Sequence, residues 1–236
     1  MCALVRCFEP NLHERGIDMT DPNLFRWPLR SLSKRPFITI FILTLLNPAP
    51  LIGDSTQAQA LKDYHLSKIR SALDLQEVQM SDEALARLTR SIANESEKHS
   101  LDPMLVMAII EVESRFDQKA VSPQGALGLM QVQPIVVAAL VEEGKISPAD
   151  KNRKLNLKDP VVNVKVGASY LAHMKDLFGD LKIALTAYNA GPTWVSKMIA
   201  AKQTLPLQYA TKVLSTQRSL ENRFARHGIS SMEASG

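Results

Sequence analysis

The residue best suited to chemistry in this sequence is a glutamate, Glu113, set in an apolar run. Four apolar residues surround it in helical projection: Val106, Ile109, Ile110 and Val112. A glutamate in water has a pKa near 4.3 and is almost fully ionised at neutral pH, so it has no proton to donate. Burial among apolar side chains raises that pKa, because the charged form loses the most solvation. The run therefore predicts that Glu113 keeps its proton near neutral pH and serves as a general acid.

A second acid, Glu111, lies in the same run. Two residues at about 100° each turn it roughly 200° away from Glu113 around a helix, so the two carboxyls cannot serve one site. A glutamate on a core helix is also commonly a surface or ion-paired residue. Helical periodicity alone does not choose between the two acids.

Two polar clusters follow the glutamate along the chain. S-P-Q-G-A-L-G-L-M-Q occupies residues 122–131, and A-Y-N-A-G-P occupies residues 187–192. In the first cluster, Gly125 and Gly128 permit a turn with positive φ and a close approach of a ligand to the backbone. The side-chain amide of Gln131 is a group that hydrogen-bonds polar ligands. Both clusters are therefore candidates for the walls of a binding site.

The chain that carries these residues is predicted to be almost entirely helical. After residue 60 the alternating pattern of a strand is almost absent, whereas apolar residues recur three and four positions apart. Asp102 is an N-cap candidate followed by proline, which specifies the start of the helix that holds Glu113. Helices are expected at about 81–98, 103–115, 136–142, 161–178, 181–189, 192–200 and 206–223. The predicted fold class is all-α.

The N-terminal residues are predicted to form an export signal. Basic residues precede an apolar run at 37–46, and small residues lead up to Ala60, which is the pattern of a secretory signal. The ten residues of the run fall short of the roughly 20 that span a bilayer. We expect residues 1–60 to be a leader, cleaved after Ala60 or kept as an N-terminal anchor. An uncleaved leader would be the only contact with a membrane, and the rest would be exported to the periplasm or cell envelope.

Three further segments are expected after the leader. Residues 61–80 are moderately amphipathic and form either a lead-in helix packed on the domain or a tether. Residues 81–226 form the helical domain that carries the candidate site. Residues 227–236 are small and polar at their end and are expected to be a flexible tail.

Composition narrows the classes of function. A formal net charge of +4 suits a polyanionic surface, but the sequence lacks the dense basic stripe of nucleic-acid binders, so no nucleic-acid partner is expected. Both cysteines, Cys2 and Cys7, precede the apolar run, so the exported part has no disulfide. The histidines show no ligand spacing and the sequence has no phosphate loop, so neither a metal nor another cofactor is implied.

Three motifs in order resemble one known family. Glu113-Ser114, the 122–131 cluster and the 187–192 cluster are similar to the signature of the soluble-lytic-transglycosylase (SLT) domain family, glycoside hydrolase family 23. The match continues through further residues: Asp159, Pro160, Asn163, Gly167, Tyr170, Leu171, Phe178, Pro206, Tyr209, Val213 and Leu214. It covers about residues 81–214. The resemblance implies a lysozyme-like helical domain with a substrate cleft.

The resemblance also implies a reaction on peptidoglycan glycan strands. Glu113 resembles the family's only catalytic acid, which protonates the oxygen that links N-acetylmuramic acid to N-acetylglucosamine. The same carboxyl then acts as a base on the muramoyl 6-hydroxyl, whose attack leaves a 1,6-anhydro end without using water. Tyr188 resembles the tyrosine whose hydroxyl orients this carboxyl. The substrate-binding residues that the resemblance implies are Ser114, Met130, Gln131, Tyr188 and Asn189.

Some of the candidate residues have a second interpretation from the sequence. Ser114 could simply end its helix with a backbone hydrogen bond, and Met130 could be a core residue. Glycosidases with two carboxylates need them about 5 to 9.5 Å apart. Asp117 would share the face of Glu113 if the helix continued, although the family has Asn or Asp there in a turn. Trp194 departs from the family pattern, as does Gln133, and is either a sugar platform or a core aromatic.

Two rival functions remain open from the sequence. A hydrolytic muramidase would activate a water molecule and leave a reducing end. A non-catalytic glycan-binding module of an envelope secretion apparatus would keep the cleft without turnover. The presence of Glu113, Gln131, Tyr188 and Asn189 argues against the second rival, because a pure binder has no need of a buried acid. Envelope or secretion machinery remains a further candidate partner.

Overall fold

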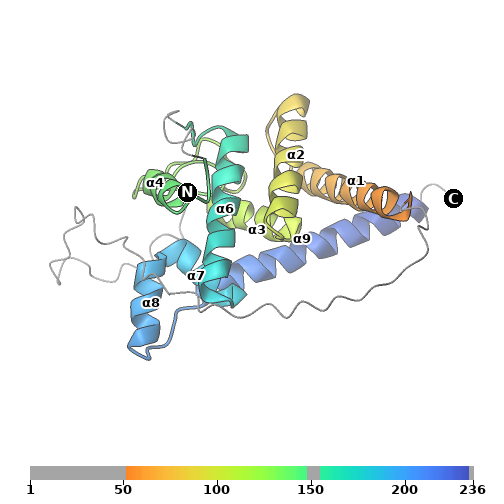
Figure 1. Ribbon diagram of the computed structural model, residues 1–236. Helices are drawn as coiled ribbons and strands as arrows, with labels where there is room; N and C mark the ends of the chain where they lie inside the picture. Colours follow the sequence, from red (N-terminus) through yellow and green to blue (C-terminus); the bar gives the residue numbers. More distant parts are fainter. Residues whose placement is uncertain (1–51, 148–154, 234–236) are drawn as a thin grey trace, which may run out of the picture. The chain divides into compact units, whose positions relative to one another are not determined.

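The computed structural model describes residues 52–147 and 155–233, all of which belong to one compact unit of the chain. The described residues form eight helices, drawn in Figure 1: α1 (Ile52–Leu75), α2 (Asp82–Lys98), α3 (Pro103–Ser114), α4 (Pro134–Glu142), α6 (Pro160–Phe178), α7 (Leu181–Ala190), α8 (Pro192–Ala200) and α9 (Gln208–Glu233). In this part of the chain the only β-type pairing consists of isolated bridges at Val121, Leu127 and Val132. The all-α prediction is confirmed.

Helix α3 lies at the centre of the packing. The Asp102 side chain accepts a hydrogen bond from the Met104 amide at 2.7 Å, and Pro103 occupies the first helical position, as the sequence predicted. Every residue from 103 to 110 is buried, which fits a helix that is apolar on all sides. Helices α1, α2 and α9 all pack against α3. The surrounding helices therefore fix the position of its C-terminal end, where Glu113 lies.

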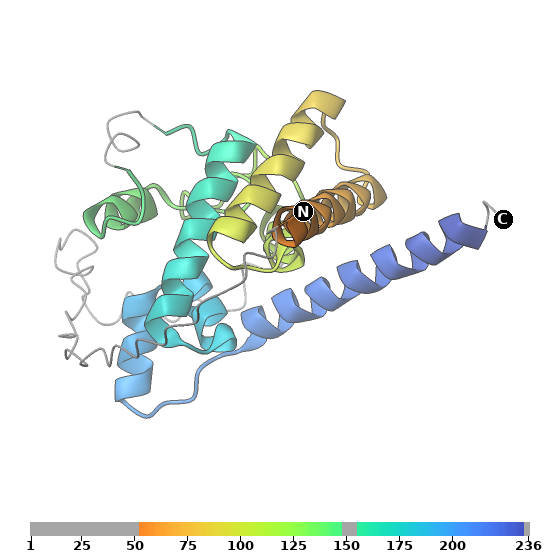
Figure 2. The same ribbon diagram turned by 45° about the vertical axis from the view of Figure 1, so that its right-hand side comes forward.

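Helix α6 connects the second half of the fold to the first. It packs against α2, α4 and α7, and it lies beside α2 in both views of the molecule (Figures 1 and 2). Its N-cap, Asp159, accepts hydrogen bonds from the amides of Val161 and Val162, so the helix starts at Pro160. Helix α7 follows after Gly179 and packs against α8 and α9. Residues from α3, α6, α7 and α9 are thereby brought together although they are far apart in sequence.

Helix α1 covers most of the predicted lead-in segment. It packs against α2, α3 and α9, which is the first of the two arrangements expected for residues 61–80. The Tyr64 ring meets the Phe224 ring of α9 edge-on, with centroids 6.2 Å apart. The cleavage position predicted after Ala60 falls inside α1, whereas the apolar run at 37–46 and both cysteines lie outside the described residues. Cleavage of the leader remains a prediction.

Most predicted helix limits lie within a few residues of the observed ones, but the end of α9 is an exception. The sequence predicted an end near Arg223, and the helix continues to Glu233. Residues 227–233, expected to be a flexible tail, are therefore helical, and α9 continues through Gly228 although glycine commonly ends a helix. None of the helices in the described part of the chain is both long and apolar enough to cross a lipid bilayer.

Candidate active site

Glu113 lies in the last turn of α3, at the point where the buried helix reaches the surface. The helix ends directly after it, because Arg115 and Phe116 adopt left-handed conformations with φ of 51° and 64°. Neither residue is a glycine, so each conformation carries a backbone cost of the order of 1 kcal/mol or more. Burial of the Phe116 side chain, which is 7% exposed, holds the chain in this turn. The turn leaves Glu113 half-buried at a fixed helix end.

Tyr209 on α9 holds the Glu113 carboxyl. Its hydroxyl donates a hydrogen bond of 2.5 Å to Oε1 of Glu113, across the contact between α9 and α3. Burial raises the pKa of Glu113 from 4.5 to about 7, while the Tyr209 hydrogen bond and the charge of Lys212 oppose the rise. Desolvation is the larger effect, as the apolar run predicted. A substantial fraction of Glu113 is therefore protonated near neutral pH.

The neighbouring acid, Glu111, faces another part of the fold. Its Oε2 accepts hydrogen bonds from Gln76 at 2.8 Å and from Arg223 at 3.3 Å. These partners belong to the segment after α1 and to the C-terminal half of α9. Glu111 is thus the ion-paired glutamate and Glu113 the acid with a raised pKa, as the 200° separation around the helix requires.

The loop at 121–132 is folded around a buried asparagine of α6. Asn163 donates hydrogen bonds of 2.7 Å to the carbonyl oxygens of Leu127 and Leu157, and its Oδ1 accepts one of 2.7 Å from the Met130 amide. A Cβ on Gly128 would lie 2.5 Å from Asn163 Nδ2, and the residue has a φ of 71°. The close approach at Gly128 is therefore made by Asn163 and by the Leu157 carbonyl oxygen.

Met130 and Tyr188 have structural contacts that differ from the predicted ones. The Met130 side chain is fully buried against Gly167, where an added Cβ would meet its sulfur at 2.5 Å, so it does not line an open cleft. The Tyr188 hydroxyl donates a hydrogen bond of 2.8 Å to the Met130 carbonyl, not to Glu113. The prediction that Tyr188 orients the acid is corrected: Tyr209 makes that contact, and Tyr188 fixes the loop.

The other predicted binding residues keep accessible surface. Gln131 is half-buried with a φ of 48°, and its amide nitrogen donates to the carbonyl oxygens of Ala120 and Gly128. The Ser114 hydroxyl donates to the Ile110 carbonyl at 3.1 Å, which is the helix-ending role considered for it. Asn189 is exposed in the last turn of α7. Their contacts with a substrate remain predictions.

Asp117 does not share the face of Glu113, because α3 ends before it. Its Oδ1 accepts a hydrogen bond of 2.8 Å from the Lys119 amide, which is an Asx-type turn on an exposed loop. Asp117 would lie on the same face as Glu113 only if α3 continued past it, and α3 ends at Ser114. The structural turn role fits the observed contact.

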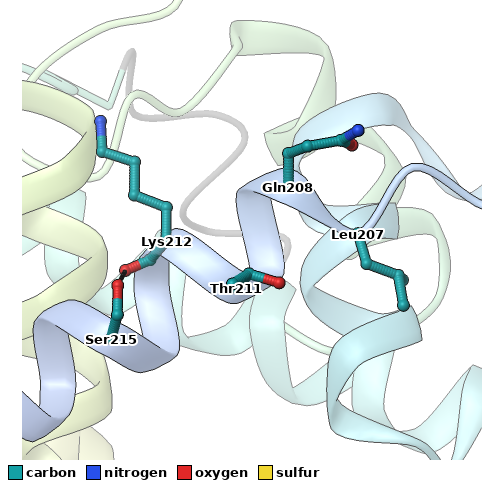
Figure 3. Close-up of a pocket in the computed structure, with 5 residues that line it drawn as sticks. All are labelled: Leu207, Gln208, Thr211, Lys212 and Ser215. Carbon is teal, nitrogen blue, oxygen red and sulfur yellow. Dashed lines mark hydrogen bonds between the residues drawn. The ribbon is translucent and has the colours of Figure 1, made fainter.

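Sequence reasoning missed two residues of this site, both on the first turns of α9. Tyr209 belonged to the family pattern but had no assigned role, and Lys212 was not singled out. Lys212 lines an open pocket of about 560 Å³ together with Leu207, Gln208, Thr211 and Ser215 (Figure 3). The only sequence signal for Tyr209 was its place in the motif, since it lies 96 residues after Glu113.

Residues 90–210 match the family model of the Transglycosylase SLT domain. The match takes in more than half of the chain, and it contains Glu113, the loop around Asn163, Tyr188 and Tyr209. The chain therefore belongs to the Transglycosylase SLT domain family, as its three motifs indicated. This membership, with the helical architecture of the described residues, supports the predicted lysozyme-like class.

Relatives of known name share the central part of the chain. The soluble lytic murein transglycosylase of Salmonella typhimurium is 39% identical over 94 residues, 38% of this chain and 14% of that protein. The transglycosylase of Enterobacteria phage PRD1 is 33% identical over 101 residues, 43% of this chain and 34% of that protein. The membrane-bound lytic murein transglycosylase C of Edwardsiella ictaluri is 32% identical over 116 residues, 45% of this chain and 32% of that protein.

The similarity is confined to part of each relative. The chain spans 14% to 34% of the length of these three proteins. A crystal structure of an inactive mutant of the lytic transglycosylase Slt from Pseudomonas aeruginosa is similar over 71% of this chain and 28% of that chain. The TM-score is 0.44 and the sequence identity is 25%.

Proposed function

We propose that this protein is a peptidoglycan lytic transglycosylase that uses Glu113 as its single general acid and base. It would cleave the β-1,4 bond from N-acetylmuramic acid to N-acetylglucosamine and leave a 1,6-anhydro-N-acetylmuramic acid end. The observation that carries this proposal is the half-buried carboxyl of Glu113, which has a pKa of about 7 and accepts a hydrogen bond from Tyr209. Membership of the SLT domain family agrees with it.

The raised pKa of Glu113 suits both proton transfers of this reaction. The protonated carboxyl donates its proton to the glycosidic oxygen while the bond from that oxygen to the anomeric carbon breaks. The resulting carboxylate then takes the proton of the muramoyl 6-hydroxyl, whose oxygen bonds to the anomeric carbon. Near its pKa a group donates and accepts a proton with similar ease, so one residue can perform both steps. Tyr209 would hold the carboxyl in place through each change of charge.

The surroundings of Glu113 favour an intramolecular attack over a hydrolytic one. Two-carboxylate glycosidases need a second acid about 5 to 9.5 Å from the first. Glu111 is turned away and paired with Arg223, and Asp117 is engaged in a turn beyond the end of α3. Both acids nearest in sequence are thus committed elsewhere, which supports Glu113 working without a carboxylate partner.

The proposed substrate contacts come from the end of α3, the 121–132 loop and the last turn of α7. Ser114, Gln131 and Asn189 would bind sugar hydroxyls and acetamides through the parts of their side chains that remain accessible. The substrate would be the glycan strand of the cell wall, and the protein would work in the periplasm or cell envelope after export. Relatives named as soluble and as membrane-bound murein transglycosylases agree with an envelope location.

Mass spectrometry of the sugar products tests the proposal. The purified protein is incubated with peptidoglycan, with Glu113→Gln and the exposed-site variant Glu97→Gln as matched controls. We expect anhydro-muramoyl ends from the wild type and from Glu97→Gln, and none from Glu113→Gln. Reducing ends one water heavier would indicate a hydrolytic muramidase. Glycan binding by the wild type without products would indicate a non-catalytic module of an envelope apparatus, and either result would overturn the proposal.

A further inference from the structure

The start of α9, the helix that carries Tyr209, lines an open pocket. Its volume is about 560 Å³, and its lining residues are Leu207, Gln208, Thr211, Lys212 and Ser215. Gln208, Thr211, Lys212 and Ser215 recur three and four positions apart, so they share one face of the helix. Figure 3 shows the extended side chains of Gln208 and Lys212 on the upper side of α9. The pocket thus offers one cation, one amide and two hydroxyls, of which that of Ser215 already donates its hydrogen to the Lys212 carbonyl oxygen at 2.8 Å.

Lys212 links this pocket to the acid. It follows Tyr209 by three positions, so the two residues are neighbours on the helix surface, and Lys212 lies at the edge of the pocket face that is nearer to Tyr209. Its charge acts on the Glu113 carboxyl, and the Lys212 side chain is exposed. Among the residues that the structure describes, no carboxylate forms an ion pair with Lys212, unlike the pairs at Arg70, Lys145 and Arg223.

We propose that Lys212 is a specificity residue that binds a carboxylate on the side arm of the muramoyl residue being cleaved. This inference rests on the proposed function, because it names which part of a wall strand would occupy the pocket. The polysaccharide backbone of N-acetylated sugars carries no charge, whereas the side arm of muramic acid carries carboxylates. These belong to the stem peptide in intact strands and to the lactyl group in strands stripped of peptide.

The composition of the pocket fits this ligand better than it fits a sugar ring. An ammonium group exposed beside a depression pairs with a carboxylate at a cost in desolvation that is small, because both groups keep part of their water. Gln208, Thr211 and Ser215 provide side-chain groups for the peptide amides that accompany a stem carboxylate. Among the described residues that line the pocket there is no aromatic side chain, which is the group that sugar stacking would require. Leu207, 36% exposed, adds an apolar surface for a short side chain.

The test measures binding of three glycan ligands in the Glu113→Gln background, where neither cleavage nor the charge of Glu113 contributes. The ligands are strands with stem peptides, strands stripped of peptide by an amidase, and an uncharged tetramer of N-acetylglucosamine. Lys212→Gln is compared with Lys212→Arg, which keeps the charge, and with Arg90→Gln, which removes an exposed charge from α2. Isothermal calorimetry at low and high salt gives the dissociation constants.

We expect Lys212→Gln to weaken binding of a carboxylate-bearing strand about three- to tenfold at low salt, with a smaller effect at high salt. Sensitivity confined to peptide-bearing strands would assign the contact to the stem, and sensitivity confined to stripped strands would assign it to the lactyl carboxylate. Binding of the tetramer should not change, and Lys212→Arg and Arg90→Gln should bind like the parent. Unchanged binding of both strands, or an equal loss for the tetramer, would overturn the inference.

The proposed function is tested by cleavage, independently of the binding measurements on Lys212. Absence of cleavage by the wild type on any strand would remove the proposed function, whatever Lys212 does. If the wild type cleaves strands but Lys212→Gln binds them as tightly as its parent protein, only the proposed role of Lys212 is overturned. The two proposals are therefore distinguishable in one set of proteins.

Discussion

The burial of Glu113 has a measurable effect on stability, because its pKa differs between the folded and unfolded states. In the folded protein the pKa is about 7, against an ordinary value of 4.5. Between these pH values the folded state binds the proton more tightly than the unfolded state. The free energy of unfolding therefore falls as pH rises through this window, and the loss is complete above about pH 7. Glu113→Gln removes this titration, so its stability relative to the wild type should increase with pH.

The size of this effect follows from the shift. A change from 4.5 to about 7 corresponds to about 3 kcal/mol, at about 1.4 kcal/mol for each pKa unit. Urea unfolding at pH 4 and at pH 8 measures the free energy of unfolding of both proteins. From pH 4 to pH 8 the free energy of unfolding of Glu113→Gln should rise by up to about 3 kcal/mol relative to that of the wild type.

A comparison across pH cancels the effects that do not titrate. The different packing of an amide adds the same amount at both pH values, and the preference of the Tyr209 hydrogen bond for the carboxylate is already part of the pKa of about 7. Glu97→Gln, which removes an exposed carboxyl on α2, is measured alongside as the control. If the difference between Glu113→Gln and the wild type is the same at pH 4 and pH 8, the Glu113 carboxyl has an ordinary pKa in the folded protein.

Three further substitutions separate the roles of residues around the acid. Tyr209→Phe removes a hydrogen bond that lowers the pKa of Glu113. The alkaline limb of the pH-rate profile should therefore move to higher pH while turnover falls, and an unmoved limb would argue against the contact. Tyr188→Phe leaves the Met130 carbonyl without its partner, so we expect a loss of about 1 to 3 kcal/mol in urea unfolding and an unmoved pH limb. Gly167→Ala places a Cβ against the Met130 side chain, so it should lower the free energy of unfolding by about 1 to 3 kcal/mol. A further Met130→Ala change should recover part of this loss. An unchanged thermal unfolding midpoint in Gly167→Ala would contradict the packing described.

The parts of the fold that sequence reasoning predicted are those with local signals. Asp102 before Pro103 fixed the start of α3, and Asp159 before Pro160 fixed that of α6, because capping and the proline ring act within a few residues. The protonated state of Glu113 was likewise predicted from the apolar residues within one helical turn. In each case the physical cause lies next to the residue in the sequence.

The parts that could not be predicted depend on contacts between distant segments. Arg115 and Phe116 end α3 in left-handed conformations without a glycine to signal it, and the turn is held by burial of Phe116. Met130 is buried because Gly167, a residue of α6, leaves room for its side chain. The choice between Tyr188 and Tyr209 as partner of Glu113 depends on where α7 and α9 place their hydroxyls, which no local pattern reports.

The proposed chemistry depends on a proton held by Glu113 near neutral pH, and a titration of that carboxyl measures this directly. Glutamate labelled with carbon-13 at the carboxyl allows NMR measurement of each titration midpoint, and the Glu113 signal is assigned by its absence in Glu113→Gln. We expect a midpoint near pH 7 in the wild type and a higher midpoint in Tyr209→Phe. A midpoint near the ordinary value of 4.5 in the folded wild-type protein would contradict it.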